Sequence, residues 1–74
     1  MKLNEFITKF AEQLDIEDSS SLEAGTLFRE LEEWSSLSVL ELIVFYDEEF
    51  DKQIGDTDIA ECQTIADLFT LAIK

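Results

Sequence analysis

Apolar residues recur every three or four positions along most of this chain, the spacing that places side chains on one face of an α-helix. The first stripe predicts an amphipathic helix over residues 4–14, followed by a polar loop over residues 15–21. Its members are Leu3, Phe6, Ile7, Phe10, Ala11 and Leu14. We expect the next apolar residues to pin the long connection that follows to the core, and Trp34 to pack it onto the bundle. These residues are Leu22, Leu27, Phe28 and Leu31.

The second predicted helix covers residues 36–50 and is apolar over most of its circumference. Its candidate core stripe comprises Val39, Leu42, Ile43, Tyr46 and Phe50. Leu37, Leu40 and Val44 form a second stripe at helical spacing, and Phe45 lies between the two. One stripe is enough to bury a helix on a small bundle, so the second must be covered by another element or offered to a partner.

The remainder of the chain predicts a short helical turn over residues 56–62 and then a longer helix. Thr64 is the predicted N-cap of that helix, and Asp67 completes a capping box in which Asp replaces the usual Glu or Gln. The inward candidates of the short turn are Ile54, Ile59 and Cys62. The stripe of the last helix comprises Ile65, Leu68, Phe69, Ala72 and Ile73.

Together these elements predict an all-α fold, a small helical bundle of three main helices plus one short helix. No strand pattern competes with it. No internal repeat or linker divides the 74 residues, so we expect a single domain over residues 1–74. A chain of this length has room for one core but not for an enclosed active site as well.

Acidic residues dominate the charged positions. There are 18 Asp and Glu against 5 Lys and Arg, which gives a formal net charge of -13. This balance argues against nucleic-acid binding, because phosphate contacts need clustered Lys and Arg, and it disfavours anionic membrane surfaces. It favours a basic protein partner reached by electrostatic steering. The hydrophobic content of 46% is too high for a disordered acidic segment.

Residues that carry chemistry are few. The chain has no His and one Cys, Cys62, which removes the Ser-His-Asp triad, an internal disulfide and the usual zinc sites. We therefore expect a non-catalytic protein without a metal site, in which Cys62 is a small buried hydrophobe. The sequence has no secretory signal and no apolar run of membrane-spanning length, so we expect a cytoplasmic monomer without membrane insertion.

Residues 32–51 read E-E-W-S-S-L-S-V-L-E-L-I-V-F-Y-D-E-E-F-D, and this stretch resembles the acyl carrier protein family. That family carries an Asp-Ser-Leu motif at the start of its second helix, and Ser36 and Leu37 match its Ser-Leu pair. The acidic end of this helix with Phe50, and the start of the last helix at Thr64, follow the same family pattern. The resemblance covers essentially the whole chain and implies an acyl-carrier-protein-like bundle.

The resemblance implies that Ser36 carries 4'-phosphopantetheine, on which acyl intermediates are held as thioesters and presented to partner enzymes. The cargo stays open among fatty acids, as in fatty acid biosynthesis, polyketide units, amino acids and sugar-modifying acyl groups. The implied partners are a phosphopantetheinyl transferase and acyl-loading and acyl-processing enzymes with basic docking patches. Phe45 and Ile59 are candidates to flank a cavity for the acyl chain. We expect the partners to contact Leu37, Leu40, Glu41, Val44, Asp47 and Glu48.

Two positions depart from the family pattern and leave an alternative open. Ser35 stands where the family usually has an Asp that helps the transferase recognise many carriers, and Gly55 stands where many members have Pro. The alternative function is an unmodified, carrier-like helical adaptor for protein–protein interaction. An ion-binding module is disfavoured, because Asp56 and Asp58 lack the downstream ligand series of an EF-hand loop.

Overall fold

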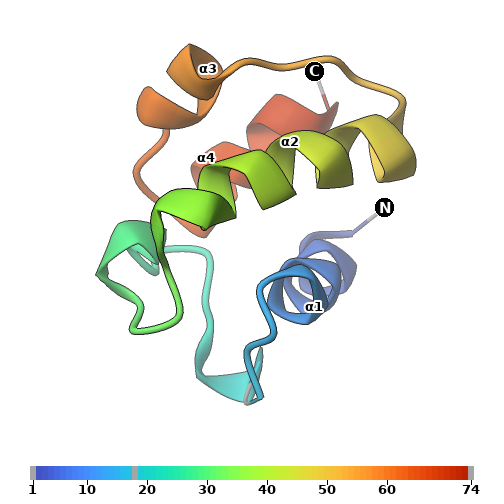
Figure 1. Cartoon of the computed structure of the whole chain (residues 1–74). Coiled ribbons are helices and arrows are strands. Elements are labelled where there is room, and N and C mark those ends of the chain that lie inside the picture. The colour runs from blue at the N-terminus through green and yellow to red at the C-terminus, as the bar shows by residue number, and fades with distance from the viewer. Residues whose placement is uncertain (1, 18, 74) are drawn as a thin grey trace.

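The computed structural model describes residues 2–17 and 19–73, which fold into four α-helices and two short 3-10 helices. The elements are α1 (Leu3–Gln13), η1 (Ser19–Ser21), η2 (Phe28–Glu30), α2 (Ser36–Phe50), α3 (Asp56–Ala60) and α4 (Ile65–Ile73). In Figure 1, α2 runs across the molecule between α3 and α1, with α4 behind it. The predicted all-α bundle of three main helices and one short helix is confirmed. Within the described ranges, no helix is both long enough and apolar enough to cross a membrane.

An aspartate with a left-handed backbone follows α1 after one residue and α2 directly. Asp15 has a φ of 60° and Asp51 a φ of 53°, a region that Asp tolerates better than most residues other than glycine. After α1, the Ile16 N–H donates to the Ala11 carbonyl at 2.8 Å. This bond satisfies a carbonyl at the helix end and turns the chain away. Helix α1 therefore ends one residue earlier than its apolar pattern predicted.

The core is built around Phe6 of α1, whose ring meets five other aromatic rings. Their centroids lie 5.5–6.4 Å from that of Phe6 and belong to Phe10, Phe45, Tyr46, Phe50 and Phe69. Leu42 of α2 and Leu68 of α4 are also fully buried. Burying a side chain of this size stabilises a fold by about 1.5–3 kcal/mol, and each aromatic pair adds about 0.5–1.5 kcal/mol. The apolar faces of α1, α2 and α4 thus form one cluster.

The long connection between α1 and α2 is held by both side chains and backbone. Leu22 and Phe28 are buried as predicted, whereas the expectation for Leu27 is wrong, because its side chain is 44% exposed. Leu27 instead forms an antiparallel backbone bridge with Thr64 just before α4. The ring of Trp34 packs on Phe28 with a centroid distance of 4.9 Å. The connection is therefore fastened to α4 through its main chain as well as to the core.

Helix α4 buries a narrower face than its apolar pattern predicted. Ile65, Leu68 and Ala72 are buried, but Ile73 is 58% exposed, so its assignment to the core is wrong. Ile73 directly follows Ala72, and one residue turns a helix by about 100°, which takes this side chain off the buried face. The Tyr46 hydroxyl donates a hydrogen bond to the Leu68 carbonyl and ties α2 to α4. Burial raises the pKa of this phenol, so it stays neutral.

Candidate functional site

The start of α2 is capped by Ser35 and Ser38. Ser35 has an extended backbone, with φ -140° and ψ 176°. Its N–H donates to the Ser38 Oγ at 2.9 Å, and its carbonyl accepts from the Ser38 N–H at 3.0 Å. The Ser38 side chain is 1% exposed. Ser38 is thus a buried and hydrogen-bonded part of the cap, which its position in the sequence did not distinguish from the other two serines.

Ser36 lies between these two capping residues as the first residue of α2. Unlike Ser38, it is exposed to solvent. Its hydroxyl makes no hydrogen bond within the described part of the chain. The first N–H groups of any helix lack an intrahelical acceptor and lie at the positive end of the helix dipole. The Ser36 hydroxyl is therefore free at a position that suits an attached phosphate, and the Ser35 side chain next to it is exposed as well.

The second apolar stripe of α2 begins directly after Ser36. Leu37, Leu40 and Val44 are 63%, 60% and 49% exposed, while Leu42 on the opposite side of the helix is fully buried. The four helices therefore share one core without using this stripe. An exposed apolar stripe of three large side chains is a surface suited to a partner.

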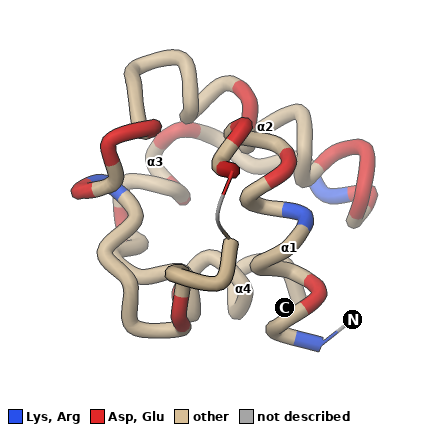
Figure 2. Tube along the Cα trace, turned by 90° about the horizontal axis from the view of Figure 1, so that it is seen from below, with Lys and Arg blue, Asp and Glu red and all other residues tan. Residues whose placement is uncertain are grey.

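Acidic side chains flank the apolar stripe along α2. Asp47 and Glu48 are exposed, and Glu41 is partly exposed. Glu49 differs from them, because its carboxylate lies 3.5 Å from the Lys9 ammonium of α1 and pairs the two helices. Figure 2 shows acidic positions distributed over the whole trace and few basic positions among them. The site thus combines an apolar stripe with carboxylates in a field that is negative overall.

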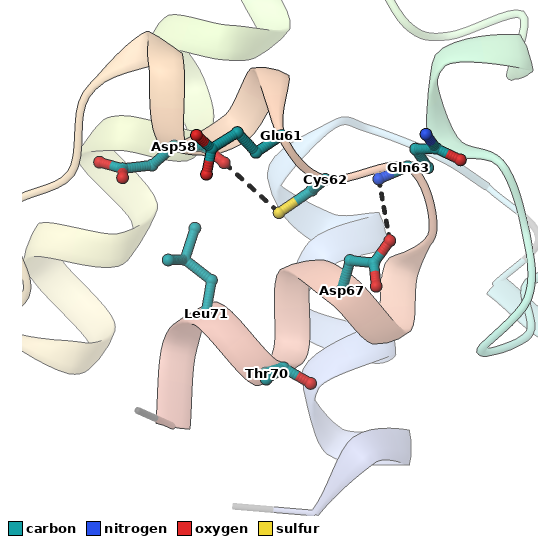
Figure 3. A pocket seen from close by; sticks show the side chains of 7 residues that line it. All are labelled: Asp58, Glu61, Cys62, Gln63, Asp67, Thr70 and Leu71. Carbon is teal, nitrogen blue, oxygen red and sulfur yellow. Dashed lines mark hydrogen bonds between the residues drawn. The ribbon is translucent and has the colours of Figure 1, made fainter.

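A hollow lies between the end of α3 and the outer face of α4 (Figure 3). It is lined by Asp58, Glu61, Cys62, Gln63, Asp67, Thr70 and Leu71. Hydrogen bonds from the N–H groups of Gln63, at 3.0 Å, and Thr64, at 3.1 Å, hold the pKa of the Asp67 carboxyl below its ordinary value. The Thr64 hydroxyl accepts from the Asp67 N–H at 3.2 Å, so the predicted capping box is confirmed. Asp58 likewise accepts from the Gly55 N–H at 2.9 Å, so two of the carboxylates in this hollow cap helices.

The other side chains of interest near α3 are buried. Cys62 is 7% exposed, as predicted for a small buried hydrophobe, and its thiol lies 3.5 Å from the Asp58 carbonyl oxygen. Phe45 and Ile59 are 3% and 1% exposed and line neither this hollow nor a second one near the end of α1. The second hollow is lined by Asp15, Ile16, Glu17, Ser21, Leu22, Leu31 and Glu33. Among the described residues, no group of three or more His, Cys, Asp and Glu is placed to hold a metal ion.

Arg29 is the functional candidate that the sequence did not indicate. Its guanidinium donates to the Cys62 carbonyl at 2.5 Å and to the Ile59 carbonyl at 2.7 Å. It also lies over the Phe28 ring, 4.7 Å from the centroid. No periodicity or motif signals such a contact, because it joins segments about thirty residues apart in the chain.

The fold and this site define a small, acidic, all-helical protein that exposes the Ser36 hydroxyl and an apolar stripe at the start of α2. No family model, no curated protein and no solved structure matches the chain.

Proposed function

We propose that this protein is an acyl carrier in which Ser36 bears a 4'-phosphopantetheine arm. The observation that supports this role most strongly is that the three serines at the start of α2 make different contacts. The Ser35 backbone and Ser38 form the helix cap, whereas Ser36 is the first residue of α2 and its exposed hydroxyl is free. The Ser36-Leu37 pair also occupies the position that the resemblance to the acyl carrier protein family assigns to the attachment site.

The protein needs no catalytic group of its own for this function. A separate transferase converts the Ser36 hydroxyl into a phosphodiester, and the arm supplies the thiol that bears the acyl group. The phosphate on Ser36 is favoured by the free N–H groups and dipole at the start of α2. Cys62 takes no part in this chemistry, because it is buried.

Partner enzymes dock on α2 beside the arm. Leu37, Leu40 and Val44 supply exposed apolar area, and Glu41, Asp47 and Glu48 face basic side chains of the partner. Each exposed ion pair contributes only about 0.2–1 kcal/mol, but together the charges speed encounter. Such a surface associates rapidly and releases easily, which suits a carrier that visits several enzymes.

The decisive experiment is modification with coenzyme A and a phosphopantetheinyl transferase, followed by intact mass and peptide mapping. We expect one phosphopantetheine on the wild type, located on Ser36, and none on Ser36→Ala. Ser35→Ala is the matched control, because it removes the neighbouring exposed hydroxyl and keeps the two backbone bonds that Ser35 makes with Ser38. Modification of Ser36→Ala, or an unmodified wild type with several transferases, would contradict the proposal.

The second candidate function is a helical adaptor without an arm. The exposed stripe of α2 supports it independently, because an apolar docking surface needs no cofactor. Ser35 at the usual Asp position favours the same function. An adaptor would stay unmodified in the transferase experiment and would still lose partner binding when the α2 stripe is truncated.

A further inference from the structure

Helix α3 is too short to be stable without help from the rest of the molecule. It has five residues, Asp56–Ala60, whereas isolated helices below about 12–15 residues are marginal in water. Ile59 is its one buried residue, and Asp56 and Asp58 place two carboxylates in its first turn. Its position beside α2 therefore depends on contacts from other elements.

Arg29 supplies such a contact at the C-terminal end of α3. The two arms of its guanidinium reach the carbonyls of Ile59 and Cys62 at 2.7 and 2.5 Å. Charged donors make stronger hydrogen bonds than neutral ones, and a cation is favoured where carbonyls point out of a helix end. The Ile59 carbonyl also accepts from the Cys62 N–H at 3.0 Å, so the guanidinium bonds to the same acceptor that closes the turn at the end of α3.

Arg29 is itself held in place by the core. It belongs to η2 (Phe28–Glu30), and its guanidinium lies 4.7 Å from the centroid of the fully buried Phe28 ring. Trp34 packs on the same ring, directly before the cap of α2. A continuous set of contacts therefore links α3, through Arg29 and η2, to the segment that sets where Ser36 lies.

We propose that Arg29 is a positioning residue: it straps α3 to η2 and so holds the surface beside Ser36 in the form that partner enzymes recognise. This inference rests on the proposed carrier function. Helix α3 lies beside α2 in Figure 1, and the two helices are in contact. The planar guanidinium donates to two carbonyls in a fixed geometry, whereas the ammonium of lysine is a single point charge. Arg29→Lys therefore restores only part of the function.

Hydrogen exchange on the full chain tests the strap without any partner. In Arg29→Gln we expect the amides of Glu61 and Cys62, which donate to carbonyls of α3, to exchange about three- to tenfold faster, since a partly exposed charge-assisted contact is lost. The amides of α1 and α4 should keep their protection. Lys9→Gln is the matched control, because it removes the same unit charge from a pair that does not touch α3. Unchanged exchange at α3, or an equal increase in all helices, would overturn the strap.

Transferase kinetics test the positioning role. We expect Arg29→Gln to raise the KM for the carrier about three- to tenfold while kcat stays constant, with Arg29→Lys intermediate and Lys9→Gln near wild type. A wild-type KM in a variant whose Glu61 and Cys62 amides exchange faster would refute the positioning role of Arg29. A fall in kcat alone would do the same, since chemistry belongs to the transferase. If wild type itself is not modified, the carrier function fails, and the exchange data still decide whether the strap exists.

Discussion

At the scale of single residues, carboxylates with similar sequence surroundings have different roles. Asp67 accepts two backbone N–H bonds and caps α4, while Glu49 pairs with Lys9, and Asp47 and Glu48 are exposed on α2. The role of each carboxylate follows from whether an N–H group or a cation faces it. Asp47 and Glu48, which are exposed beside the apolar stripe, are available to a partner that docks there.

The Asp67 cap predicts a specific dependence of stability on pH. Its hydrogen bonds lower the pKa in the folded state, whereas an unfolded Asp titrates near about 3.9. The cap therefore stabilises the fold fully above that pH and is lost as the pH falls through the lower, folded pKa. We expect Asp67→Asn to melt below wild type at pH 7, and the difference to shrink below about pH 4. A difference in melting temperature that stays constant from pH 7 to pH 3 would contradict this role.

At the scale of elements, α2 carries two apolar faces with different roles. Leu42 and Tyr46 on one face are fully buried, and the Tyr46 hydroxyl bonds to the α4 backbone. Leu40 and Val44 on the other face are 60% and 49% exposed. Burial, rather than residue type, separates the face that stabilises the bundle from the face available for binding.

Alanine substitutions on the two faces should therefore change different properties, stability on the buried face and partner binding on the exposed face. Leu42→Ala should destabilise the fold by about 2–5 kcal/mol, because it removes fully buried methyl groups and leaves a cavity. Val44→Ala should change the free energy of unfolding by less than about 0.5 kcal/mol but speed dissociation from the transferase. Denaturant unfolding and association and dissociation rates measure the two effects. If Val44→Ala unfolds as readily as Leu42→Ala, the stripe belongs to the core and the docking surface is wrong.

At the scale of the whole molecule, the dominant feature is a net charge of -13 on a fold whose principal extents are 28 × 26 × 19 Å. At an ionic strength of 0.01 M the Debye length is about 30 Å, so carboxylates on opposite sides of the molecule repel one another. At 0.15 M it falls to about 8 Å. Self-repulsion destabilises a compact state, and the Lys9–Glu49 pair offsets little of it.

Added salt should accordingly stabilise this protein. We expect the melting temperature to rise by several degrees between about 0.01 and 0.15 M sodium chloride, because screening removes repulsion. An equal rise in potassium chloride would show that screening, rather than binding of one cation, is the cause. A melting temperature that stays constant or falls with salt would mean that local ion pairs outweigh the long-range repulsion.

The sequence alone determined the helices and much of their capping. Interactions between residues three or four apart form within each segment, so periodicity located α1, α2 and α4, and the Thr64 to Asp67 spacing identified the α4 cap. The same periodicity separated the two faces of α2. The sequence also picked out Ser36, through the resemblance of the Ser36-Leu37 pair to the acyl carrier protein motif.

The tertiary structure decided everything that depends on segments far apart in the chain. It buried Ser38 and left Ser36 exposed, turned Leu27 outward by pairing its backbone with Thr64, and brought Arg29 to the end of α3. No local pattern encodes these contacts, because each partner is defined only after the helices have packed. Many arrangements of apolar side chains can fill a core. A backbone bridge, or a guanidinium that donates to two carbonyls, requires one particular arrangement of the segments.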